Sequence, residues 1–455
     1  MHNDMLHPGP VPTLQPYFLI SPPAPWVIWV RKLAIAFAAV CSVLDASAQQ
    51  TRILTLDEAE KLALKNHPRI ASAAFNAQAA SSVVTQVRSA FQPFVAANVT
   101  TAGAERDTAI AAGQLQTSGL ASRAATGIGV SQLITDFGRT SSLADSARLR
   151  AAVQERNVAT TKAQVLLQVE QAYYSVLAAD AVLKVAQARV GMLEVTLRQV
   201  RALAESNLKS TLDVSFAEVS LSESQLALYQ AENAAKASRA TLAAAIGETK
   251  DEPFEVADVI LPGRVADDAQ TLVDEALKNR PDLSVARLTE SAALRFADAE
   301  KRLQYPAVSL VGVVGVVPIH QKDFTSQYSA VGLNISVPFL NGGLNAARRA
   351  EAELRARGAG KDSEAVSLQV AANVRLAWLE ADTAWRRIDV TAKLVDQATT
   401  TLRLANTRYE IGLSGILELT QAQFSQTSAQ IAAANAKYDY LTRVANLNYA
   451  IGALR

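Results

Sequence analysis

The chain has 455 residues, with 44 Lys and Arg against 43 Asp and Glu, so its formal net charge is only +1. Charged residues make up 19%, which offers no surface for polyanions and argues against nucleic-acid binding. Hydrophobic residues reach 49% while aromatic residues reach only 6%. Because much of the apolar content is alanine, this composition suits thin helices packed side by side better than a thick globular core.

The first 48 residues have the organisation of a secretory leader. Arg31 and Lys32 precede the apolar run Leu33–Leu44, and Ala46-Ser47-Ala48 follows it. A charged start, a short apolar core and an A-x-A site are typical of a signal peptide. The apolar run is too short to span a bilayer as a helix. We therefore expect residues 1–48 to be removed and the mature chain to begin near Gln49.

The only cysteine, Cys41, leaves a lipoprotein alternative open. Cleavage would then precede Cys41 and the thiol would be acylated, although Val40 is a poor residue before such a site. Cleavage at Ala48 instead leaves a mature chain without thiols, which is ordinary for an exported protein with a sufficient core.

The rest of the sequence is nearly a duplication. Leu56–Val99 matches Leu272–Val314 with Pro68 aligned to Pro281, an offset of 213. From Ser131 onward the offset is 205, because the first copy carries a longer loop. A duplicated long unit indicates a pseudo-symmetric object. We expect a first repeat over 49–247, a linker over 248–271 and a second repeat over 272–455.

Each repeat predicts a helix, a β-hairpin and a long helical hairpin. In the first copy the helix is Pro68–Phe91, the β-hairpin covers about 93–134 and the helical hairpin about 139–247. In the second copy the two hairpins cover about 306–338 and 341–452. No proline interrupts the long helices, of which Thr140–Leu203 would be roughly 95 Å long and Leu212–Ile246 roughly 52 Å.

A seven-residue repeat runs along both long helices. Its alternating steps of four and three are typical of a left-handed coiled coil. In the first copy the two seams are Val165, Ala172, Ala179, Ala186, Leu193, Val200 and Val169, Val176, Leu183, Val190, Leu197. In the second copy they are Val374, Ala381, Ile388, Val395, Leu402, Tyr409 and Val370, Ala377, Ala384, Thr391, Ala398, Ala405.

Four strands are expected, and each alternates apolar with small or polar residues. They are Phe94–Thr101, the stretch around Ile128 and Val130, Val308–Val317 and Tyr328–Val337. One alternative is that the two hairpins pack on a soluble core. However, no amphipathic partner for their apolar face is evident in the sequence, and lipid would cover that face instead. Four strands cannot close a barrel and an open edge cannot sit in lipid. Three chains would together supply twelve strands.

No catalytic or metal-binding arrangement is visible. His67 and His320 lack metal-type spacing with each other or with a cysteine, and neither a nucleophile elbow nor a phosphate loop is present. The sequence therefore predicts neither an enzyme nor a cofactor.

The ordered motifs resemble the outer-membrane efflux protein family, the TolC-like channels. The resemblance covers about Leu54 to Gly452. The segments that carry it are Leu54–Pro68 with Leu272–Leu283, Gln132–Arg139 with Val337–Gly343, and Arg408–Gln423 with Ala204–Glu218.

The resemblance implies a mainly α fold with a membrane β-barrel. Three chains would form a homotrimer, each giving four strands to a 12-stranded barrel in the outer membrane and its long helices to a periplasmic coiled-coil tunnel. The helical-hairpin tips would meet a periplasmic adaptor and an inner-membrane pump of an efflux or type I secretion system.

The resemblance also implies an aperture at the tips. By alignment, Tyr409 corresponds to a gate tyrosine, Glu418 to a ring acid and Asp213 to the acid of the first copy. Gln421 replaces a second ring acid, and Ser414 replaces a gate arginine. Asp213 also has the position of an acid that opens a helix, and Tyr409 lies on a heptad seam, so packing roles remain open for both.

A periplasmic coiled-coil adaptor is the alternative reading. Adaptors also carry helical hairpins, but they lack a duplicated helix-strand-strand-helix unit, and no lipoyl-like or β-barrel domain is readable between these helices.

Overall fold

The computed structural model describes residues 52–103, 123–248, 254–266, 268–319 and 325–454. The leader with Cys41, the outer parts of both strand loops with His320, and part of the linker lie outside these ranges. The expected leader and lipidation therefore stay predictions.

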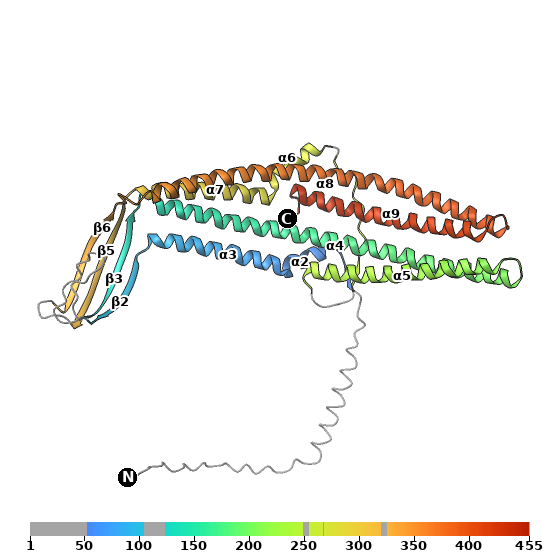
Figure 1. Ribbon diagram of the computed structural model, residues 1–455, viewed down its shortest axis with the longest axis horizontal. Coiled ribbons are helices and arrows are strands. Elements are labelled where there is room, and N and C mark those ends of the chain that lie inside the picture. Colours follow the sequence, from blue (N-terminus) through green and yellow to red (C-terminus); the bar gives the residue numbers. More distant parts are fainter. Residues whose placement is uncertain (1–51, 104–122, 249–253, 267, 320–324, 455) are drawn as a thin grey trace, which may run out of the picture. The chain divides into compact units, whose positions relative to one another are not determined.

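The described helices occur as pairs of equal length, one member in each repeat (Figure 1). The pairs have 11, 21, 67 and 36 residues. They are α2 (Leu56–Asn66) with α6 (Ala269–Asn279), α3 (Pro68–Arg88) with α7 (Pro281–Lys301), α4 (Arg139–Glu205) with α8 (Leu344–Glu410), and α5 (Thr211–Ile246) with α9 (Ile416–Ile451). Short 3₁₀ turns, η1 (Ser89–Phe91) and η2 (Arg302–Gln304), end α3 and α7.

The predicted long helices and their heptad seams are confirmed. Every residue of the four seams is buried or half-buried. The helix α4 packs against α3, α5, α7 and α9, while α8 packs against α6, α7 and α9. Small side chains on one seam let these axes approach, so the apolar contacts are spread thinly along the rods rather than gathered in one core.

The four predicted strands form one antiparallel sheet in the order β2-β3-β5-β6. Its strands are β2 (Phe94–Ala102), β3 (Arg123–Thr135), β5 (Ala307–Ile319) and β6 (Gln327–Ser336). The hairpins of the two repeats join through the β3–β5 pair. Within the described ranges β2 and β6 are edge strands, so each presents a row of unpaired backbone groups.

The two faces of the sheet differ in composition. Directly opposed residues share a face, so the register defines each side. One face carries exposed apolar side chains, namely Val95, Val99, Ile128, Val130, Leu310, Val314, Val316, Val331, Leu333 and Ile335. The other face is richer in small and polar residues, although it also exposes Phe94, Val311 and Val313. On that face a side chain at Gly127 or Gly315 would collide with Tyr328, whose ring crosses both strands.

As for the helices, none in the described ranges is both long and apolar enough to cross a membrane.

Two short strands that the sequence did not predict lie midway along the long helices, at the expected linker between the repeats. The strands β1 (Arg52–Leu54) and β4 (Phe254–Val256) pair with each other, and residues 254–266, here called the equatorial segment, continue from β4. The Tyr173 hydroxyl lies 3.0 Å from the Leu54 carbonyl and 2.7 Å from that of Ala257. At the equivalent place in α8, Trp378 Nε1 donates to the Ala266 carbonyl at 2.7 Å. Both repeats thus hold this segment with an aromatic donor.

Candidate functional site

The two helical hairpins reverse at tips of similar construction (Figure 1). In the first tip Asn207 takes the left-handed conformation with φ 55°, and in the second Gly412 does so with φ 77°. An exposed leucine follows each, Leu208 at 70% and Leu413 at 68%. The four residues predicted from the resemblance all lie within three helical turns of these reversals.

Tyr409 is buried where the two hairpins meet. Its side chain is 6% exposed and clusters with Val200, Ile416 and Leu419. The Lys209 ammonium group lies 4.3 Å from the centre of its ring, a cation–π contact across the hairpins. Burial, and to a lesser extent the nearby Asp213 carboxylate, raises the pKa of Tyr409. Its hydroxyl has no hydrogen-bond partner among the described residues, so closing this contact leaves a buried polar group unsatisfied.

Asp213 opens α5 as the third residue of a capping box. The Ser210 amide donates to Asp213 Oδ2 at 3.3 Å, and the Ser210 hydroxyl accepts from the Leu212 amide at 3.1 Å. Its side chain therefore anchors the start of the return helix. The second tip lacks this device, because α9 begins after Gly415 without a side-chain cap.

Glu418 and Gln421 lie elsewhere, in a groove between α8 and α9. The groove holds about 410 Å³ and is also lined by Leu404 and Arg408. Arg408 Nε lies 3.0 Å from Glu418 Oε1, and both side chains are about half exposed. The carboxylate is therefore already paired within its own chain, an exposed contact of modest strength.

The structure thus divides the four candidates into two pairs. Tyr409 lies at the contact between hairpins with the Asp213 carboxylate close enough to affect its pKa, whereas Glu418 and Gln421 share the α8–α9 groove. Sequence reasoning missed Lys209 and Arg408 as their partners. Both lie inside the motifs already noted, but only the length of each turn places them opposite these residues.

A second unusual feature lies away from the tips, where α2 packs on α4. The Glu170 side chain is 6% exposed and shares a hydrogen bond with Glu60. Burial, followed by repulsion from Glu60, raises the pKa of Glu170 to about 7. Across the described ranges no group of His, Cys, Asp or Glu could hold a metal ion. A hydrogen bond between two carboxyl groups requires a proton on one of them, so Glu60 and Glu170 share a proton.

A model of the family "Outer membrane efflux protein" matches residues 60–248 and 272–453. Outer membrane protein TolC of Vibrio cholerae is 25% identical over 412 residues, covering 88% of this chain and 91% of that protein. The probable efflux pump outer membrane protein TtgC of Pseudomonas putida is 25% identical over 373 residues, covering 79% of this chain and 75% of that protein.

Solved structures of outer-membrane channels share the fold. The outer membrane protein VceC of Vibrio cholerae superposes with a TM-score of 0.75 at 20% identity, covering 87% of this chain and 96% of that one. The open-state channel MtrE of Neisseria gonorrhoeae gives 0.70 at 21% identity, covering 87% and 88%. The family match spans most of the described residues and includes both tips. This chain belongs to the outer membrane efflux protein family.

Proposed function

We propose that this chain is the outer-membrane exit duct of an efflux or type I secretion system, and that three copies form one duct. The observation that carries the proposal is the sheet, because one face exposes a dense set of apolar side chains while the opposite face is richer in small and polar residues. Lipid on one side and an aqueous lumen on the other would satisfy both faces.

The open edges support the trimer. The strands β2 and β6 lack partners within the described ranges, and unpaired backbone groups are not tolerated in hydrocarbon. Pairing of β6 with β2 of the next chain would close a 12-stranded barrel from three chains. The repeated helix lengths likewise support the division into repeats 49–247 and 272–455 around the linker 248–271.

The tips are proposed to form the periplasmic gate. The contact between hairpins around Tyr409 consists of a small apolar cluster and one cation–π contact, and it leaves the tyrosine hydroxyl unsatisfied. A contact of this kind can separate with little change of backbone. We propose that a periplasmic adaptor and an inner-membrane pump bind at this end and favour the separated state, and that Glu418 and Gln421 face the opening.

Reconstitution tests the proposal directly. The full chain, purified in detergent, should give three-chain species by native mass spectrometry and ion-conducting channels in planar bilayers. A protein that stays monomeric and soluble without detergent, and that never conducts, would rule out the duct.

A further inference from the structure

We propose that the pocket between α7 and α8 beside the sheet binds the phosphate headgroup of a membrane phospholipid. The proposal rests on the proposed function, because it requires the sheet to lie in a bilayer. Both walls of the pocket come from one chain, so the site is complete in each subunit. Its volume is about 380 Å³, and Glu300, Lys301, Gln304, Asn345, Arg349 and Glu353 contribute polar groups to its lining.

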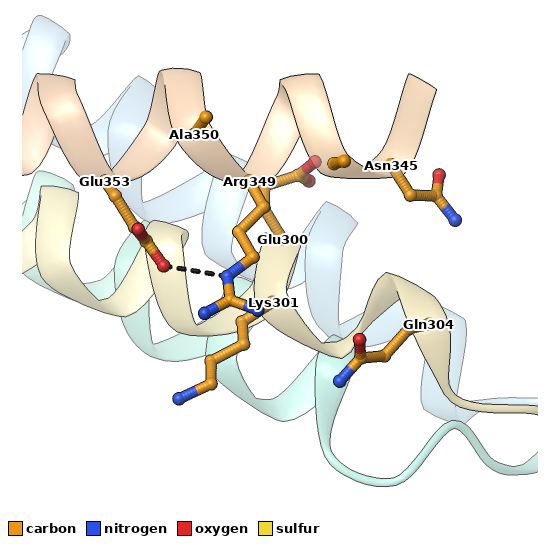
Figure 2. A pocket seen from close by; sticks show the side chains of 8 residues that line it. Glu300, Lys301, Gln304, Asn345, Arg349, Ala350 and Glu353 are labelled. Carbon is orange, nitrogen blue, oxygen red and sulfur yellow. Dashed lines mark hydrogen bonds and ion pairs between the residues drawn. The ribbon is translucent and has the colours of Figure 1, made fainter. Parts of the chain in front are cut away.

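Figure 2 shows the charged side chains of this pocket. Arg349 extends from α8 toward α7, and its Nε donates to Glu353 at 2.8 Å. The two Nη groups of Arg349 have no partner among the described residues, and the Lys301 ammonium group likewise has neither a hydrogen bond nor an ion pair there. A guanidinium fork beside a free ammonium group suits a phosphate, which accepts from both.

The acidic residues of the pocket do not cancel this charge. Glu300 is 3% exposed and pairs with Arg348 at 2.9 Å, while Arg139 lies 3.8 Å away. Glu353 is held by Arg349, and that hydrogen bond together with the surrounding Arg349, Arg357 and Lys301 charges lowers the pKa of Glu353. Counting Arg139 and Arg348 with the lining residues, cations exceed anions by two, so an anion is favoured.

The pocket opens on the outer face of the helices. Three α8 residues bind the linker 248–271, namely Arg375, Trp378 and Asp382. The pocket residues Ala346, Arg349 and Glu353 lie 29 residues before them, in the same order. A separation of 29 residues is about eight helical turns, so both sets share one face. Residues 254–266 on a lumen face would obstruct a duct. The face that carries them, and therefore the pocket, must be external.

The pocket also lies at the depth of lipid headgroups. Gln304 is three residues before β5, and Lys301 is one helical turn further, so the pocket begins within about 10 Å of the sheet. Headgroups occupy roughly 5–8 Å on each side of the hydrocarbon. Exposed aromatic residues mark the same level, with Phe91 44%, Tyr305 47% and Phe339 97% exposed, as expected of a belt at the interface.

The test measures lipid retained by the full-length trimer after extensive delipidation in nonionic detergent. Native mass spectrometry during titration with dioleoyl-phosphatidylglycerol should show up to one tightly held lipid per chain. The double variant Lys301→Gln with Arg349→Gln should weaken this binding by about tenfold or more, since each cation near a headgroup contributes substantially. Dioleoylglycerol, which has the same tails without phosphate, should not bind.

The chain offers a matched control in a second basic pocket. Lys162 and Lys278 line a pocket of about 500 Å³ roughly 30 Å further from the sheet, beyond the 21-residue α7. Lys162→Gln with Lys278→Gln should leave lipid retention unchanged. Equal retention in both double variants would overturn the proposal. Displacement of the lipid by millimolar inorganic phosphate would instead identify a site for free phosphate. In either case trimer formation and conductance persist, so this failure is distinct from failure of the duct.

Discussion

At the scale of single residues, the hydroxyl of Tyr409 distinguishes packing from gating. Tyr409→Phe removes a buried, unsatisfied polar group and keeps the ring over Lys209, so the contact between hairpins should strengthen by about 1 kcal/mol. Tyr409→Ala removes the ring and should weaken it by about 3 kcal/mol or more. In planar bilayers we expect fewer openings for the Phe variant and higher mean conductance for the Ala variant.

The control for this experiment is Tyr229→Ala on α5, where the tyrosine is 66% exposed. It should leave conductance unchanged. Glu418→Gln should reduce preference for cations, because the proposed opening would lose three carboxylates that attract them. If both tip variants conduct like the unmodified channel, Tyr409 and Glu418 only pack the hairpins and the gate lies elsewhere.

Also at the residue scale, the Glu60–Glu170 pair predicts an unusual pH dependence. The folded pKa of Glu170 is raised from 4.5 to about 7, so the folded state binds more protons than the unfolded state between these values. Stability contributed by this site is therefore present below pH 4.5 and is lost as the pH rises through 7. The full effect is at most about 3.5 kcal/mol, since one pKa unit is worth about 1.4 kcal/mol.

Glu170→Gln keeps a neutral hydrogen-bonding group without the titration. In thermal unfolding, the stability of the variant should fall less between pH 5 and 8 than that of the wild type. At pH 8 the variant should be more stable than the wild type. The exposed Glu364→Gln is the control and should keep the wild-type profile. A variant that is less stable than the wild type at pH 8 would show that the ionised pair is favourable, contrary to the expected repulsion.

At the scale of elements, sequence periodicity predicted the long helices but not the short strands and hydrogen bonds that attach the linker to them. Seams such as Val165 to Val200 repeat every seven residues, and this pattern predicts a helix whatever it packs against. The strand β4 has only three residues, too few for an alternation to be read, and it forms only because β1 lies beside it. The aromatic donors Tyr173 and Trp378 were likewise unpredictable, because their acceptors are backbone carbonyls far away in the sequence.

At the tips, local capping could be predicted from the sequence, whereas a contact across the turn could not. The acid at position 213 could be assigned to a helix start from the sequence, since Ser210 precedes it by three residues, and the capping box confirms that role. Alignment also singled out Glu418, but its pairing with Arg408 depends on how the five-residue turn reverses. Local capping is encoded within a few residues, whereas a contact across a turn needs its backbone geometry.

At the scale of the whole molecule, an apolar stripe on α8 predicts where neighbouring chains meet. Exposed side chains recur at steps of 11 and 14 residues, which are about three and four helical turns, at Leu354, Leu368, Leu379, Val390 and Leu404. They lie opposite the buried residue Ala352, which faces α7. A second stripe on α5 contains Leu212, Phe216, Val219 and Leu226. Both stripes would be left in water by a single chain, so each requires a partner.

Charge placed on the α8 stripe should therefore prevent assembly without unfolding the chain. Leu379 and Val390 are 52% and 63% exposed, so Leu379→Glu with Val390→Glu disturbs little within one chain. Three such pairs would bury six unpaired carboxylates in the trimer, at a cost of several kcal/mol each. Native mass spectrometry in detergent should show monomers with unchanged helical circular dichroism. Ala392→Glu with Thr399→Glu, also exposed on α8 but on the face opposite the stripe, should still give trimers. Intact trimers from the stripe variant would place the contact between chains on another face.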